Sequence, residues 1–247
     1  MSKLQQKVAL ITGGSRGIGA GIAKRFAREG AIVAITYVNG KQKAEEIVRE
    51  IEAAGGKALA IQADSANPVA VKNAVAVTVE NFGRVDILVN NAGVAILKPL
   101  EDYTLEDFNQ TIAVNVQAVF VASQEVIKNM PEGGRIINIG SAVAESVNSA
   151  TQTLYALSKT ALTGLTKGLA RDLGGRKITV NLVQSGPVKT DMFVTADKAL
   201  QDLLLGFMAV KEFGEVEEIA SLVSWVASED ARYMTGASIT IDGGLSV

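Results

Sequence analysis

The chain contains no cysteine and no histidine among its 247 residues. Without cysteine it cannot form disulfide bonds, thiolate nucleophiles or cysteine-based zinc and iron–sulfur sites. Without histidine it cannot build a Ser-His-Asp triad, an H-E-x-x-H metal site or any acid–base step that uses an imidazole. Any proton that this protein transfers must therefore move through Tyr, Lys, Asp, Glu or Ser side chains, and we predict no metal site.

The chain also lacks an excess of one charge and any long apolar run. Its 24 basic residues nearly balance its 26 acidic residues, and no basic cluster is long enough to follow a phosphate backbone. The first apolar run stops at Thr12, too early for a secretory signal. No stretch approaches the roughly 18 apolar residues of a membrane span. We therefore expect a cytoplasmic protein with no nucleic-acid partner and no membrane partner.

Aromatic residues make up only 5% of the chain, whereas apolar residues in total make up 48%. This balance is typical of a globular protein, and the length predicts a single domain over residues 1–247. Short apolar runs, which are typical of buried strands, alternate with segments of helical periodicity. The predicted strands are 8–12, 31–37, 57–62, 85–89, 135–140, 177–183 and 237–242. The predicted helices are 17–29, 41–54, 68–82, 104–130, 152–173 and 215–228.

Alternating strands and helices favour parallel strands that are joined by right-handed crossovers. The sequence therefore predicts a doubly wound α/β fold around a seven-stranded parallel sheet. One connection, residues 187–213, is long and looks irregular, although it contains apolar side chains such as Leu203 and Phe207. Long connections in compact domains are often functional, and we interpret this one as a lid over the substrate, with a static packing flap as the alternative.

A glycine-rich turn, TGGSRGIG at 12–19, joins the first predicted strand to the first helix. Glycines at 13, 17 and 19 permit a tight turn and a close approach to a pyrophosphate, and the N-terminus of the following helix attracts an anion. A turn that binds nothing would use the same residues, but the position in a doubly wound pattern favours a nucleotide. The fourth strand ends in NNAG at 90–93, at the expected crevice, although this segment alone also fits a simple turn.

A second group of polar side chains follows the fifth predicted strand. Ser141 lies at its end, and the spacing of Tyr155 and Lys159 places both on one face of the next helix. A cation beside a phenol favours the phenolate and lowers its pKa. A lone Tyr and Lys would usually be surface residues. In a chain without histidine, and with Ser141 at the same sheet edge, they are the best candidates for acid–base chemistry.

Taken in order, these motifs resemble the short-chain dehydrogenase/reductase family over essentially all 247 residues. Asn115, the segment ITVNLV at 178–183 and the closing TGASITIDGG at 235–244 extend the match. Within the family the chain is similar to β-ketoacyl-[acyl-carrier-protein] reductases and bacterial carbonyl reductases. The resemblance implies a Rossmann-like fold and the reversible reduction of a ketone or aldehyde to an alcohol.

The resemblance also implies roles for individual residues. Tyr155 would exchange the proton with the carbonyl oxygen, Lys159 would lower the Tyr155 pKa and bind the nicotinamide ribose, and Ser141 would hold the carbonyl oxygen. Asn115 would anchor a water in a proton relay. The implied cofactor site, in which Asp64 contacts adenine and the last four residues flank the nicotinamide, consists of Gly13, Ser15, Arg16, Gly17, Ile18, Gly19, Tyr37, Asp64, Asn91, Ala92, Gly93, Tyr155, Lys159, Gly186, Pro187, Val188 and Thr190.

The choice of cofactor has its own physical argument. Family members that use NAD carry an acidic residue at the end of the second strand, where this chain has Tyr37. A carboxylate there would repel a 2′-phosphate, and none is present. Arg16 in the glycine-rich turn, aided by Asn39 or Lys41, is available to pair with that phosphate. We therefore predict NADP(H).

The family also implies a homotetramer, with helices 104–130 and 152–173 at one interface. Ser185 stands where relatives carry proline, and the interval from Ser141 to Tyr155 is one residue longer than in many relatives, so the substrate cannot be carried over. We expect a small apolar carbonyl or alcohol. One alternative is the reduction of carrier-bound acyl groups, for which Lys128 and Arg171 are scattered basic candidates. The other is a nucleotide-binding regulator, which would not need the complete Ser141–Tyr155–Lys159 set.

Overall fold

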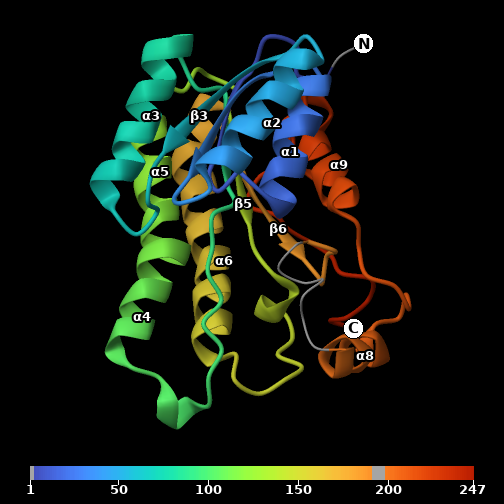
Figure 1. The fold of residues 1–247 in the computed structure, drawn as a ribbon. Coiled ribbons are helices and arrows are strands. Elements are labelled where there is room, and N and C mark those ends of the chain that lie inside the picture. The colour runs from blue at the N-terminus through green and yellow to red at the C-terminus, as the bar shows by residue number, and fades with distance from the viewer. Residues whose placement is uncertain (1–2, 191–197) are drawn as a thin grey trace.

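The computed structural model describes residues 3–190 and 198–247, and a sheet flanked by helices lies at its centre (Figure 1). The seven strands of this sheet are parallel and lie in the order β3-β2-β1-β4-β5-β6-β7. The order runs outward in both directions from β1 and β4, which confirms the predicted doubly wound, seven-stranded Rossmann-like fold. The strands are β1 (Val8–Ile11), β2 (Ile32–Tyr37), β3 (Lys57–Gln62), β4 (Ile87–Asn90), β5 (Arg135–Ile139), β6 (Thr179–Ser185) and β7 (Ser238–Ile241).

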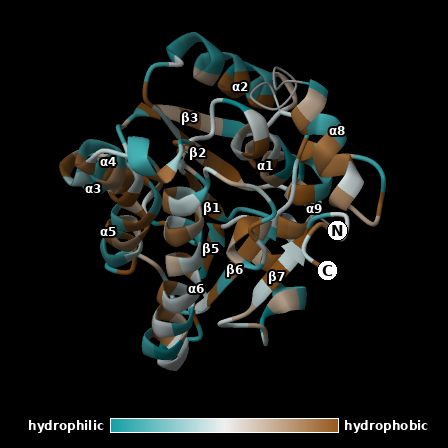
Figure 2. Ribbon diagram, turned by 90° about the horizontal axis from the view of Figure 1, so that it is seen from below, coloured by the Kyte–Doolittle hydropathy of each residue, from teal (hydrophilic) through white to brown (hydrophobic). Residues whose placement is uncertain are grey.

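Helices cover both faces of this sheet. Those described are α1 (Gly17–Arg28), α2 (Lys41–Ala53), α3 (Pro68–Phe82), α4 (Leu105–Ile112), α5 (Ala118–Val126), α6 (Thr153–Leu173), α8 (Lys198–Phe207) and α9 (Val216–Ala227). Buried side chains of α1, α2 and α9 pack on one face, and those of α3, α5 and α6 pack on the other. Figure 2 shows the apolar strands between helices whose outer surfaces are polar. No helix in the described part of the chain is long and apolar enough to cross a membrane.

Two predicted segments differ from the structure. The single helix expected over 104–130 is instead α4 and α5, with a π-helical turn between them at Ala113–Gln117. The connection 187–213 is not irregular throughout, because it contains α8 at Lys198–Phe207. Residues 191–197 of the proposed lid lie outside the described residues. One extra residue in a turn shifts the apolar pattern that follows by a single position, which is too small a change to recognise from periodicity in a segment of this length.

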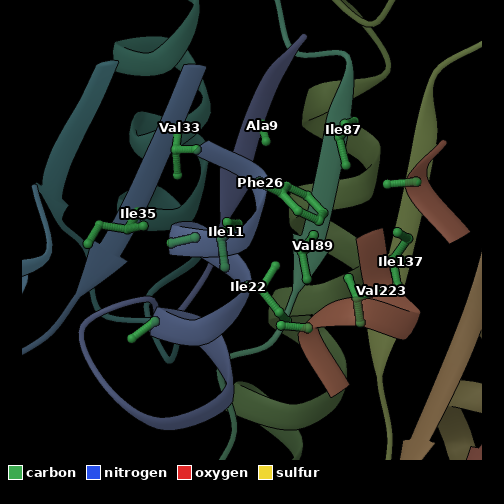
Figure 3. Packing of buried hydrophobic residues seen from close by; sticks show 14 of the residues in the cluster. Ala9, Ile11, Ile22, Phe26, Val33, Ile35, Ile87, Val89, Ile137 and Val223 are labelled. Carbon is green, nitrogen blue, oxygen red and sulfur yellow. The ribbon is translucent and has the colours of Figure 1, made fainter. Parts of the chain in front are cut away.

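The face covered by α1 and α9 is built from small and branched side chains around Phe26, which is completely buried (Figure 3). The two helices pack very closely at Gly21. A Cβ atom there would lie 2.2 Å from Cγ1 of Val216, much closer than two non-bonded carbon atoms approach. Glycine at position 21 therefore decides how near α9 lies to the helix that carries the glycine-rich turn.

We predict that Gly21→Ala destabilises the protein by about 1–3 kcal/mol, because the added methyl group overpacks the contact with α9. The second change Val216→Ala removes the clashing methyl groups. The double variant should therefore be less destabilised than the sum of the two single effects predicts. Chemical denaturation of the four proteins measures this coupling. Strictly additive effects would contradict the close contact as the cause.

Candidate active site

The glycine-rich turn is held at the carboxyl end of β1 by backbone geometry that glycine permits. Gly13 and Gly17 have φ values of +66° and +54°, in the left-handed region that side chains disfavour. A Cβ atom at Gly19 would lie 2.4 Å from the Gly13 carbonyl oxygen. Arg16, at the N-cap of α1, makes no capping bond with its side chain. The first N–H groups of α1 therefore point toward the turn as an anion site would require.

Asn91, directly after β4, joins this turn to the neighbouring strand. Its Nδ2 atom donates to the carbonyl oxygens of Thr12 (2.9 Å) and Gly13 (3.0 Å). The Thr12 hydroxyl oxygen in turn accepts from the backbone N–H groups of Asn91 and Ala92, each at 3.0 Å. These four bonds lock the glycine-rich turn and the NNAG segment together across the point where the strand order reverses.

A pocket of about 780 Å³ opens beside these two segments, within the size range of small-molecule and cofactor sites. It lies at the carboxyl ends of β1, β2 and β4, where doubly wound sheets bind their ligands. Twelve of the residues that the sequence assigned to a cofactor line it: Gly13, Ser15, Arg16, Gly17, Ile18, Gly19, Tyr37, Asp64, Asn91, Ala92, Gly93 and Thr190. The glycine cradle and the uncapped helix N-terminus fit a dinucleotide.

Of the two lysines that follow β2, only Lys43 lines the pocket. Asn39 lines the pocket as expected, and so does Lys43. Lys41 is not among the lining residues and instead lies 3.7 Å from the carboxylate of Glu45. Both lysines belong to the first turn of α2, and positions two apart in a helix point to different sides. The sequence showed a basic helix start but not which lysine faces the pocket.

Ser141, Tyr155 and Lys159 come together at the carboxyl end of β5. Ser141 caps a short 3₁₀ helix by accepting from the N–H of Val143 (3.3 Å), and its hydroxyl hydrogen-bonds the Tyr155 side chain. Lys159 is 5% exposed, donates from Nζ to the Ile139 carbonyl oxygen (2.9 Å) and has Nζ 5.8 Å from the centroid of the Tyr155 ring. The spacing of four residues on α6 thus brings a phenol and an ammonium group to one place.

The pKa values of this pair are set mainly by burial. Burial raises the pKa of the Tyr155 phenol above its ordinary value, and the bond from Ser141 opposes that rise. Burial also lowers the pKa of the Lys159 ammonium to about 8. The Lys159 ammonium hydrogen-bonds the Ile139 carbonyl oxygen in the protein without cofactor, and burial sets the direction of the Tyr155 shift there. A lowering of the Tyr155 pKa by Lys159 when cofactor is bound stays a prediction. Among the described residues no three acidic side chains gather as a metal site would need.

Asn115 is 1% exposed and lies in the π-helical turn between α4 and α5. Its Oδ1 atom accepts from the N–H of Val94, and its Nδ2 atom donates to the Val94 carbonyl oxygen and to Oγ of Ser158, all at 2.9 Å. Both side-chain N–H atoms are thus used within the protein. The side chain fastens the residue after NNAG, and a water-anchoring role for Asn115 stays a prediction.

The remaining predicted residues follow β6. A Cβ atom at Gly186 would lie 2.6 Å from Cα of Asp242, so glycine is required for this close backbone approach. Val188 forms a β-bridge with Gly214. Gly186, Pro187 and Val188 do not line the described pocket, whereas Thr190 reaches the glycine-rich turn beside Gly17. The segment therefore leads from the end of β6 back toward the pocket.

Known proteins resemble this chain in sequence and in fold. A family model described as enoyl-(acyl carrier protein) reductase matches residues 13–246. A solved short-chain dehydrogenase from Burkholderia cenocepacia, in complex with NADP, is 52% identical, with a TM-score of 0.97 over 99% of this chain and 100% of that one. The chain belongs to the short-chain dehydrogenase/reductase family.

Two curated relatives carry different names. A 3-oxoacyl-[acyl-carrier-protein] reductase from Staphylococcus epidermidis is 41% identical over 97% of this chain and 98% of that protein. A cyclic-di-GMP-binding biofilm dispersal mediator protein from Escherichia coli is also 41% identical, over 98% of both chains. Family membership is therefore compatible with more than one molecular role, and the role must be argued from the site.

We predict that Lys159→Met changes how stability depends on pH. A Lys with a lowered pKa in the folded protein holds its proton more tightly in the unfolded chain, so the wild type gains stability as the pH rises through that window. The unfolding free energy of the wild type minus that of Lys159→Met should rise by about 3 kcal/mol from about pH 8 to pH 10.5. Denaturation at a series of pH values measures this, with the exposed Lys41→Met as control. A flat difference for Lys159→Met would contradict the lowered pKa.

Proposed function

We propose that this protein is an NADP(H)-dependent oxidoreductase that reversibly reduces a ketone or aldehyde to an alcohol. The observation that carries this proposal is the meeting of Ser141, Tyr155 and Lys159 at the sheet edge that also holds the glycine-lined pocket. A binding protein has no need of a buried lysine beside a phenol. Family membership and the NADP complex of the Burkholderia cenocepacia relative support the proposal.

Different pocket residues would bind different parts of the cofactor. The N-terminus of α1 and the glycine-rich turn receive the pyrophosphate, because uncapped N–H groups favour an anion there. Asp64 lies where the adenine would bind, and Arg16 with Lys43 receives the 2′-phosphate. Lys159 and the segment from Gly186 to Thr190 would hold the nicotinamide half when the cofactor is bound. When bound, NADPH supplies the hydride for the carbonyl carbon.

The chain's own side chains supply the proton. Tyr155 donates its phenolic proton to the carbonyl oxygen during reduction, and Ser141 donates a hydrogen bond to the same oxygen. The raised pKa keeps Tyr155 protonated at neutral pH, which is the form that reduction requires. Lys159, whose pKa is about 8, is mostly charged at that pH and stabilises the phenolate that forms.

The helix α8, which belongs to the proposed lid, exposes apolar side chains. Leu200, Leu203 and Phe207 of α8 are each 40% or more exposed, and we propose that α8 forms part of a lid that selects small apolar carbonyl compounds. Leu105 on α4 (81% exposed) and Phe120 on α5 are exposed in the single chain, which supports a homotetramer that buries these helices.

The reduction of carrier-bound acyl groups remains the alternative within the enzyme class. Lys128 lies 2.7 Å from a carboxylate oxygen of Glu125, and Arg171 lines a separate groove with Lys167. These basic residues therefore lie at two separate places on the protein. At one of them the charge of Lys128 is balanced by Glu125. A panel of free ketones assayed beside carrier-linked β-ketoacyl substrates separates the two enzymes, and a regulator would turn over neither.

We predict that Tyr155→Phe lowers kcat by about 10²–10⁴ for every carbonyl substrate, because the general acid is lost. The Kd for NADPH should change little, since the ring remains. NADPH absorbance measures turnover and fluorescence titration measures binding. Tyr233→Phe, at a side chain that is 98% exposed, is the matched control. A Tyr155→Phe variant with near-normal turnover would sink the acid–base assignment and favour a nucleotide-binding role.

We further predict that Arg16→Ala and Lys43→Ala each lower kcat/KM with NADPH but not with NADH. One charge-assisted contact of about 1.5–3 kcal/mol corresponds to a loss of about ten- to a hundredfold in kcat/KM with NADPH. Lys41→Ala serves as the control, because Lys41 does not line the pocket. Equal losses with both cofactors, or a loss in the control as large as that in Lys43→Ala, would contradict recognition of the 2′-phosphate by these residues.

A further inference from the structure

Ser158 directly precedes Lys159, is completely buried, and has no part in the chemistry proposed above. We infer that Ser158 is a positioning residue: its hydroxyl sets Asn115 and the pocket wall at Val94 relative to the turn of α6 that carries Tyr155 and Lys159. The inference rests on the proposed function for its catalytic consequence. Its structural core, the bond between Asn115 and Ser158, does not depend on which substrate is reduced.

The direction of each hydrogen bond follows from the groups involved. The Asn115 Nδ2 atom can only donate, so Oγ of Ser158 accepts from it at 2.9 Å. The single proton of that hydroxyl is then directed to the Tyr155 carbonyl oxygen, 2.8 Å away. Helical serines often bond to a preceding carbonyl of their own helix. The additional bond to an amide 43 residues away in sequence links two catalytic elements through one oxygen.

Three hydrogen bonds hold the Asn115 amide in one small volume. It clasps both backbone polar groups of Val94, and its remaining N–H goes to Ser158. Val94 lines the pocket. A Cβ atom at the neighbouring Gly93 would lie 3.4 Å from Asn115 Oδ1 and 3.5 Å from Lys159 Nζ. A rotation of the Asn115 amide therefore changes the pocket wall and the surroundings of the Lys159 ammonium together.

Loss of the Ser158 hydroxyl leaves a buried N–H of Asn115 without its acceptor. The amide then gains by turning toward another partner, which releases at least one bond to Val94. The pocket wall at Val94 and the Lys159 ammonium group then occupy several positions, and only some of these positions support the reaction. Such a change acts on kcat, while the glycine-rich turn and the 2′-phosphate contacts, which lie on other elements, keep the affinity for NADPH.

The first test compares Ser158→Ala with Ser224→Ala. Ser224 is also a buried serine, 1% exposed, and donates to Glu29 at 2.6 Å, but it lies on α9 away from the catalytic residues. We expect Ser158→Ala to lower kcat about tenfold with the Kd for NADPH nearly unchanged, and Ser224→Ala to leave kcat unchanged. Equal kcat values in both variants, measured well below their melting temperatures, would overturn the inference.

The second test is a double-mutant cycle with Asn115→Ala. Since Ser158 acts through Asn115, Ser158→Ala should change kcat by less than about twofold once Asn115 is already Ala. A full tenfold loss in that background would mean that Ser158 acts by another route and would overturn the inference.

A third readout does not need turnover. The Val94 N–H donates to Asn115, so its hydrogen exchange should become faster in Ser158→Ala and stay unchanged in Ser224→Ala. Unchanged exchange at Val94 in Ser158→Ala overturns the positioning role even if the protein reduces carbonyl compounds. Faster exchange in a protein that reduces none supports the positioning role while it refutes the proposed function.

Discussion

Buried polar groups at the carboxyl ends of the central strands must find hydrogen-bond partners within the protein, and the site is organised around that requirement. Asn90 of β4 donates to Asn138 of β5 at 2.9 Å, and Asn138 donates to Thr166 of α6 at the same distance. Asn91 satisfies the carbonyl groups of the glycine-rich turn in the same way. Because a buried amide without partners is costly, each bond fixes one element against the next. Strands, turn and α6 therefore hold one relative position.

Lys159 is the most demanding member of this arrangement. It is almost fully buried, and the bond described for its Nζ atom goes to the neutral Ile139 carbonyl oxygen. Burial of an ammonium group without a carboxylate partner lowers its pKa and costs stability at neutral pH. The same burial keeps water from screening its effect on Tyr155. Stability is thus given up where the proposed chemistry needs a cation beside a phenol, as is common at functional sites.

Much of the fold was predictable because the strands of a doubly wound sheet are buried on both faces. Runs such as residues 135–140 leave few alternatives, and β5 lies at Arg135–Ile139. The π-helical turn at Asn115 was not predictable, since the hydrogen bonds that its amide makes to the Val94 backbone, 21 residues away, leave no mark on the apolar pattern. The sequence also indicated that Lys159 would lower the Tyr155 pKa. It could not show that burial dominates in the protein alone.

The sequence by itself determined the chemistry that is available and the order in which it is delivered. The composition excludes cysteine and histidine chemistry. Strand and helix periodicity then places the glycines, the amides and Ser141 at the ends of strands, and places Tyr155 and Lys159 on one face of a helix. The tertiary structure decided which side chains face one another. Lys43 rather than Lys41 lines the pocket, and Ser158 meets Asn115 from 43 residues away. Such contacts depend on the rotation and separation of packed helices, which local periodicity does not contain.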